Sequence, residues 1–198
     1  MATDHSDSAT TLVSTDMHPW DGVITHDGKW LIYRTATLSG QRDLDYMPLG
    51  GADHTSHAYL TAPADNMTPD VSPDGRWVAY MSFVTGRDEI YARAFPNAGG
   101  SVQISAGGGR EPRWSPDGRT LYYRVARTLV AADLSAGSTL TVVRRRKLFD
   151  DPYVPDAMVR NYDVSPDGKH FLMVRAVDRD AETMLVYGWA NELRRSWR

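Results

Sequence analysis

Four copies of one short pattern constrain this chain more than any other feature of its sequence. Three clear copies read SPDGRWVAYMS (72–82), SPDGRTLYYRV (115–125) and SPDGKHFLMVR (165–175), and a weaker copy reads THDGKWLIYRT (25–35). Their Asp-Gly pairs are spaced by 47, 43 and 50 residues. Self-similarity at such a period predicts a repeat fold in which each copy begins one supersecondary unit.

Each copy encodes a turn followed by a strand. Ser-Pro-Asp-Gly suits a type I turn with a left-handed residue after it, because serine bonds forward, proline presets φ and glycine accepts a positive φ. The segment that follows, such as Trp77 to Tyr80, is rich in strand formers and apolar on both faces. That composition predicts a strand covered on both sides.

Two further strands are predicted in each complete repeat. They cover Leu44 to Leu49 and His57 to Leu60, Glu89 to Phe95 and Ser101 to Ser105, and Leu129 to Leu134 and Leu140 to Phe149. Four strands per repeat with almost no helical period predict an all-β fold, a β-propeller of four-stranded antiparallel blades. The four recognisable repeats span about 16–62, 63–109, 110–155 and 156–188. Three alternatives stay open for the ring: four blades that close by themselves, an incomplete ring, or a ring completed by dimerisation.

The two ends of the chain depart from the repeat. Residues 1–15 are predicted to be flexible, apart from a short apolar stretch at 10–14. This stretch is interpreted either as a strand that closes the last blade or as the remnant of a missing blade. Residues 189–198 read WANELRRSWR and predict a basic helix or tail, which either docks a partner or covers an open blade.

Composition excludes several classes of function. The chain of 198 residues has no cysteine, which rules out disulfides, thiolate zinc sites and a cysteine nucleophile. Its net charge of −3, with both signs interspersed, gives no reason to expect nucleic acid or a membrane as a partner. No apolar run is long enough to span a membrane, and the N-terminus does not resemble a signal peptide. We therefore expect a cytoplasmic protein for the chain as given, or a periplasmic or extracellular one if it belongs to a longer, membrane-anchored protein.

Several segments carry a family resemblance. The segments GRDEIYARAFP, GGGREPRWSPDGRTLYYR, RKLFDD and NYDVSPDGKHFLMVR are similar, in order and spacing, to the C-terminal propeller of bacterial eukaryotic-like serine/threonine protein kinases. Those repeats belong to the WD-repeat-like class that also includes TolB-like proteins. The resemblance covers roughly residues 20–195. It implies an interaction domain outside a kinase catalytic domain, whereas this chain has no kinase motif of its own.

No catalytic, metal or cofactor site is predicted. The run Gly107 to Gly109 precedes a strand rather than a helix, so a plain inter-strand turn is favoured over a phosphate cradle. His54 and His57 form a His-x-x-His pair in a polar connection, which favours a surface loop over a metal site. The basic run 144–147 lies in an outermost strand and is interpreted as a solvated edge.

Propeller geometry predicts where a ligand would bind. The first strand of each blade lies at the ring axis, so charged residues of these strands are expected to line a central funnel. Charges of both signs suit a polar ligand or a peptide. The candidate ligand-binding residues are Asp70, Glu111, Arg113, Asn161 and Asp163 in the funnel, with Arg87 and Asp88, together with Arg42 and Arg179, on its rim.

These patterns lead to two hypotheses of function. The first is a non-catalytic interaction or sensor module that binds a protein, a peptide or a small polar ligand. The second is a metal-dependent hydrolase of the lactonase or esterase type that uses the funnel. The absence of a G-x-S-x-G nucleophile elbow removes the usual serine hydrolase from consideration. A homodimer that completes the ring is a further expectation.

Overall fold

A computed structural model describes residues 19–36, 40–51, 53–61, 63–96, 99–137, 139–152 and 160–174. Within these ranges the chain forms fourteen β-strands and no helix. The predicted flexible segment 1–15, with its strand at 10–14, and the predicted tail 189–198 lie outside the described residues.

The strands form three four-stranded antiparallel sheets and a two-stranded one, each with its strands in chain order. The first sheet contains β1 (Gly22–Ile24), β2 (Trp30–Ala36), β3 (Arg42–Pro48) and β4 (His57–Leu60). The second contains β5 (Asn66–Val71), β6 (Trp77–Ser82), β7 (Glu89–Ala94) and β8 (Val102–Gln103). The third contains β9 (Arg110–Trp114), β10 (Thr120–Val125), β11 (Thr128–Ala136) and β12 (Leu140–Asp150), and β13 (Tyr162–Val164) pairs with β14 (Phe171–Met173). The predicted all-β propeller of four-stranded blades is confirmed.

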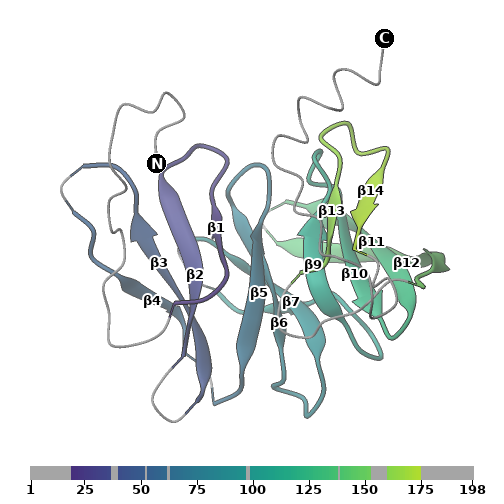
Figure 1. Ribbon diagram of the computed structural model, residues 1–198, viewed down its shortest axis with the longest axis horizontal. Coiled ribbons are helices and arrows are strands. Elements are labelled where there is room, and N and C mark those ends of the chain that lie inside the picture. The colour runs from purple at the N-terminus through teal and green to yellow at the C-terminus, as the bar shows by residue number, and fades with distance from the viewer. Residues whose placement is uncertain are drawn as a thin grey trace, which may run out of the picture.

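The sheets are arranged as blades around a common axis. In Figure 1 the first strands β1, β5 and β9 lie toward the middle, and β4 and β12 lie at opposite sides. The hydrophobic cores lie between neighbouring blades, as β6 shows. Val78 and Tyr80 pack with the first blade, whereas Ala79 and Met81 pack with the third. Because successive side chains of a strand point to opposite faces, a strand between two blades buries both sets of side chains, which explains why β6 is almost entirely apolar.

The repeated turn is held by its own side chains. In the second repeat the Gly75 amide donates to the Ser72 carbonyl at 2.8 Å, and the Ser72 hydroxyl donates to Asp74 at 2.6 Å. The Trp77 amide in turn donates to the Ser72 hydroxyl at 3.0 Å, and Gly75 has a φ of 72°. In the first repeat Thr25 bonds to Asp27 in the same way. Serine, aspartate and glycine are therefore repeated for the stability of the turn.

Two of the inner strands contain the same irregularity. Thr68 in β5 and Glu111 in β9 have φ values of 50° and 54°, and each stands four residues before the serine of its turn. The pairing register shifts at both places. A bulge of this kind redirects the side chain of the bulged residue, which decides where Glu111 points.

Within the described part of the chain, no helix has the length and apolar character needed to cross a lipid bilayer.

Candidate functional site

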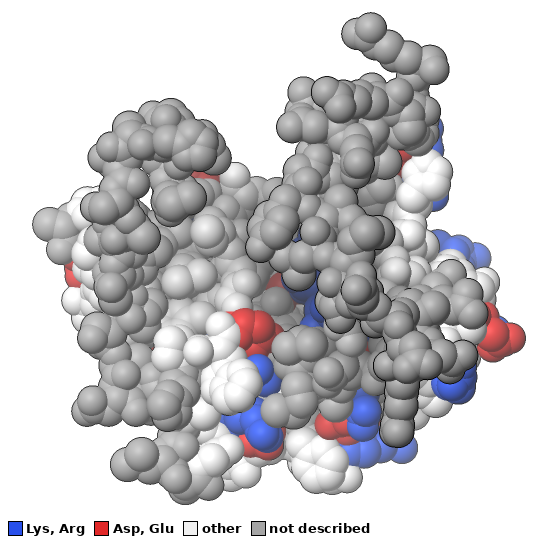
Figure 2. Space-filling view, in the orientation of Figure 1, with Lys and Arg blue, Asp and Glu red and all other residues white. Residues whose placement is uncertain are grey.

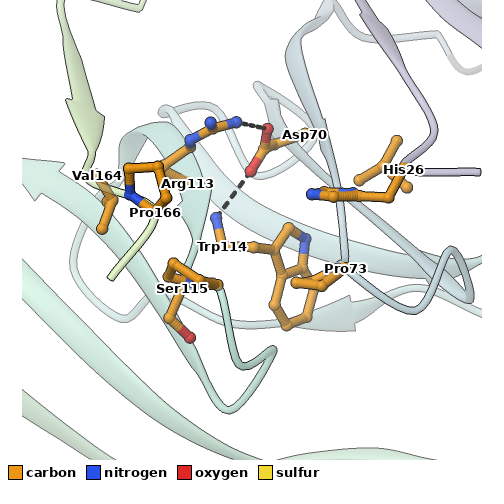
Figure 3. A pocket seen from close by; sticks show the side chains of 10 residues that line it. His26, Asp70, Pro73, Arg113, Trp114, Ser115, Val164 and Pro166 are labelled. Carbon is orange, nitrogen blue, oxygen red and sulfur yellow. Dashed lines mark hydrogen bonds and ion pairs between the residues drawn. The ribbon is translucent and has the colours of Figure 1, made fainter. Parts of the chain in front are cut away.

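A cavity of about 340 Å³ lies where the inner strands end and the repeated turns begin. Four of its lining residues occupy the same position in the four turns: His26, Pro73, Pro116 and Pro166. Because one residue comes from each repeat, the cavity lies at the axis of the propeller, and we call it the axial pocket (Figure 3).

Asp70 is the best-partnered charge of the axial pocket. Its side chain is only 1% exposed. Its Oδ1 accepts hydrogen bonds from Nη1 of Arg113 at 2.7 Å and from Nη1 of Arg160 at 3.1 Å. Its Oδ2 accepts the backbone N–H of Trp114 at 2.7 Å, an interaction drawn in Figure 3. Three donors compensate the burial of this carboxylate, as a buried charge requires.

Arg113 extends the charge network to the fourth repeat. Its Nε lies 2.7 Å from Oδ1 of Asp163, whose side chain is 51% exposed. Burial opposes the charge of Arg113, but the carboxylates of Asp70 and Asp163 outweigh this effect and raise its pKa. Figure 2 shows acidic and basic side chains close together near the middle of the viewed face. The predicted residues Asp70, Arg113 and Asp163 are thus in contact and connect three blades.

The wall of the axial pocket offers unused hydrogen-bond donors. Trp114 is 5% exposed, and its indole Nε1 has no hydrogen-bond partner. In Figure 3 this nitrogen lies on the edge of the ring that is turned toward His26. Among the described residues, no hydrogen bond involves Nη2 of Arg113, which also lines the pocket. A site of this kind suits a ligand that supplies hydrogen-bond acceptors next to an apolar surface.

Glu111 and Asn161 do not line the axial pocket. The Glu111 carboxylate is fully buried and accepts from Nη1 of Arg124 at 2.7 Å and from the Asn161 backbone N–H at 2.8 Å. Arg124 also pairs with the buried Asp151 through its Nε at 2.5 Å. Burial raises the pKa of Glu111, and the bonds from Asn161 and Arg124 only partly offset it. This cluster joins the third and fourth blades, and Asn161 contributes its backbone.

The predicted rim residues lie away from the axis. Arg87 and Asp88 line another cavity, at the opposite end of the inner strands. Arg42 forms an ion pair with Asp65 at 2.6 Å, and Arg179 lies outside the described residues. The turn between β6 and β7, which contains Arg87 and Asp88, lies beside the start of β9 at Arg110, whereas the axial pocket lies at the other end of β9, at Trp114.

Sequence reasoning missed Arg160 and the role of Trp114. Arg160 precedes β13 and stands five residues before the serine of its turn, as Arg110 does in the third copy. The repeated pattern does not show that the Arg160 side chain reaches Asp70 in another blade. Trp114 was interpreted only as part of the family resemblance. The sequence does distinguish Trp114 from its equivalents, because valine or isoleucine stands at the same position in the other three copies.

The histidine pair at 54 and 57 lies on the surface. Both residues are exposed, and the His57 ring lies 5.2 Å from the ring of Tyr46. Across the ranges that the structure describes, no three His, Asp or Glu side chains are close enough to hold a metal ion.

Comparison with known proteins supports the fold. No protein-family model matches the chain. The chain is similar to the structure of TolB from Acinetobacter baumannii, with a TM-score of 0.66 and 18% identity over 90% of this chain and 42% of TolB. It is also similar to a puromycin-hydrolysing peptidase of Mycobacterium tuberculosis, with a TM-score of 0.59 and 14% identity over 77% of this chain and 27% of that protein. At these identities the likeness concerns the fold alone, a TolB-like β-propeller.

One curated protein is similar in sequence. It is the uncharacterised peptidase YuxL of Bacillus subtilis, 36% identical over 121 residues. The match covers 58% of this chain and 18% of YuxL. The chain therefore spans less than a fifth of YuxL and less than half of TolB.

Proposed function

We propose that this protein is a non-catalytic binding module that takes a peptide or a small polar ligand into the axial pocket. One observation carries the proposal: the lining of the pocket includes unpartnered donors on Trp114 and Arg113, while its buried carboxylate is already satisfied. Unpartnered donors in a preformed cavity favour a ligand with carbonyl or carboxylate groups. The three prolines of the lining supply apolar contact area.

The partner class follows from the same features. A protein or peptide, or a small polar molecule, fits a pocket of mixed charge, and the net charge of −3 gives nucleic acid and membranes no electrostatic attraction. The proposal includes the role implied by the kinase resemblance, that of an extra-catalytic sensor domain. The compartment remains a prediction: cytoplasmic for the chain as given, periplasmic or extracellular within a longer anchored protein. The ring-completing homodimer also remains a prediction, which a mass measurement in solution tests.

A selection experiment tests the binding function. Peptides are selected from a phage-displayed library on the whole purified chain, and calorimetry measures the affinity of the enriched peptide. We expect Arg113→Met to weaken binding at least about tenfold, because a charged donor in a partly buried site is lost. Trp114→Phe keeps the ring and removes only the N–H, so it should weaken binding severalfold. Arg119→Met, an exposed arginine outside the pocket lining, is the control, and equal affinity of all variants would contradict the proposal.

A hydrolase is the second candidate function. It is favoured by the similarity of the chain to two proteins named as peptidases, YuxL and the puromycin-hydrolysing peptidase. The purified chain is assayed with p-nitrophenyl acetate and a simple lactone, with and without added Zn²⁺ or Ca²⁺. Turnover that disappears in His26→Ala, a lining residue of the axial pocket, would support the hydrolase and overturn the non-catalytic assignment.

A further inference from the structure

The fourth repeat exposes apolar side chains on the side that points away from the third blade. Leu172 in β14 is 64% exposed, and Val174, which follows this strand, is 53% exposed. Asp163 of β13 pairs with Leu172 across the sheet. We call the surface formed by these three residues the open face, and it belongs to the yellow-green strands of Figure 1. The residues equivalent to Leu172 and Val174 in the other three copies are at most 9% exposed: Ile32 and Arg34, Ala79 and Met81, and Tyr122 and Arg124.

In the other copies, the residue equivalent to Leu172 packs on the inner strand of the blade that follows. The pairs that share a core cluster are Ile32 with Val71, Ala79 with Trp114, and Tyr122 with Val164. The second member of each pair directly precedes the serine of its turn. The open face is therefore a surface that receives an apolar side chain from a neighbouring inner strand.

The first blade exposes the matching inner-strand residue. Ile24 ends β1 directly before its turn and is 53% exposed, whereas its equivalents are at most 9% exposed: Val71, Trp114 and Val164. The N–H of the next residue, Thr25, donates to the Trp30 carbonyl of β2, so the N–H of Ile24 points away from β2. Four blades that closed into a ring would pack Ile24 on Leu172. Both side chains are exposed, so this junction is not formed within one chain.

Asp163 repeats the hydrogen-bonding position of Asp70. Both aspartates stand two residues before the serine of their turns. Oδ1 of Asp70 accepts from Arg113, and its Oδ2 accepts the backbone N–H of Trp114 in the next blade. Oδ1 of Asp163 accepts from Nε of Arg113 and from the Val164 N–H, both at 2.7 Å. Within the described ranges its Oδ2 forms no hydrogen bond, so this oxygen is open to a backbone N–H from outside the chain.

Ile24 also has the size that the open face requires. The small Ala79 receives the tryptophan of the third blade, whereas the larger Ile32 and Tyr122 each receive a valine. Because protein interiors are closely packed, a large receiving residue leaves room only for a smaller partner. Leu172 resembles Ile32 in size, so an aliphatic side chain such as that of Ile24 fits against it.

We propose that a second copy of this chain binds the open face with its strand β1, in a head-to-tail contact. Ile24 of the second copy packs on Leu172 and Val174, and its backbone N–H donates to Oδ2 of Asp163. Two such contacts close a ring of two copies. The homodimer expected from the sequence thereby has a defined surface, and this contact goes beyond the proposed ligand binding and does not depend on it.

Sedimentation of the whole chain at several concentrations tests this contact. We expect a dimer for the wild type. Leu172→Asp and Ile24→Asp should each raise the dissociation constant of the dimer at least about tenfold, because each places a carboxylate in an apolar junction. The control is Val143→Asp, a strand residue that is 68% exposed and lies outside both surfaces, and it should dimerise within twofold of the wild type.

A mixture of the two variants identifies the head-to-tail arrangement. In a pair formed by one Leu172→Asp chain and one Ile24→Asp chain, one contact contains both substitutions and the other contains none. The mixture should therefore dimerise more strongly than either variant alone. A contact between two open faces would instead be insensitive to Ile24→Asp, and that result would overturn the proposal.

Two further results would overturn the head-to-tail contact. One is a wild-type chain that stays monomeric up to about 1 mM, which is weaker than a specific dimer requires. The other is a dimer that Leu172→Asp leaves unchanged, which would place the interface elsewhere. Leu172→Ala guards against misfolding, because it adds no charge, and it should weaken the dimer less than Leu172→Asp does. Peptide binding in the axial pocket is measured separately, so either proposal can fail without the other.

Discussion

At the scale of single residues, Gly109 is the described glycine at which an added Cβ atom would lie closest to its neighbours. A Cβ atom at this position would lie 2.8 Å from Ile90 Cγ1 and 2.8 Å from Ser105 Cβ. We expect Gly109→Ala to lower the free energy of unfolding by about 1–3 kcal/mol. The reason is that the buried side chains of Ile90 and Ser105 must shift to make room for the added methyl group. Gly50→Ala is the control, since nothing lies within 4 Å of its Cβ position. Urea denaturation compares the two variants, and equal midpoints would show that the contact around Gly109 relaxes freely.

At the scale of elements, the repeated turn links stability to pH. The Ser115 hydroxyl and the Arg119 amide hold the pKa of Asp117 below its ordinary value of 3.8. Hydrogen bonds likewise lower the pKa of Asp27 and Asp167. Because the folded pKa is the lower one, the stabilisation is present above the ordinary pKa and is lost as the pH falls through the folded pKa.

The variant Asp117→Ala tests this link. It should cost about 1 kcal/mol at pH 7, the contribution of a typical hydrogen bond. The difference in unfolding free energy between wild type and variant should shrink as the pH falls from 5 toward 3. Denaturation curves at several pH values measure this difference. If it stays constant down to pH 3, the charge of Asp117 has no part in the stability of the turn.

At the scale of the whole molecule, the axial charge network joins three blades. Asp70→Asn should lower the free energy of unfolding by about 1–3 kcal/mol, because the partly buried Arg113 and Arg160 lose their shared carboxylate. Asp163→Asn should cost less than about 1 kcal/mol, since that carboxylate is half exposed and screened by water. Urea denaturation ranks the two variants. Similar losses would mean that the network does not hold the blades together.

Much of the fold was predictable because its signals are local. The period of the Asp-Gly pairs, the turn chemistry of Ser-Pro-Asp-Gly and the apolar strand at 77–80 each depend on neighbours in the chain. Strand ends were less predictable: β8 covers only Val102–Gln103 of the expected 101–105, whereas β11 extends beyond the expected 129–134 on both sides. Pairing with a neighbouring strand, which is not a local property, sets these limits.

The candidate site was predictable only in part. Asp70, Arg113 and Asp163 stand two residues before the serine of their turns, and equal positions in a repeat converge at the axis. Glu111 stands four residues before its serine and was expected beside them. The bulge with its positive φ instead turned this side chain toward Arg124 and the fourth blade.

By itself, the sequence determined the repeat, the turn and the buried strand, because each follows from the conformational preferences of adjacent residues. The tertiary structure alone decided which charges share a cavity. Arg160 meets Asp70 across ninety residues of chain, and Arg87 and Arg127 line one cavity from different blades. Such meetings depend on the order and packing of the blades around the axis, which no local pattern specifies.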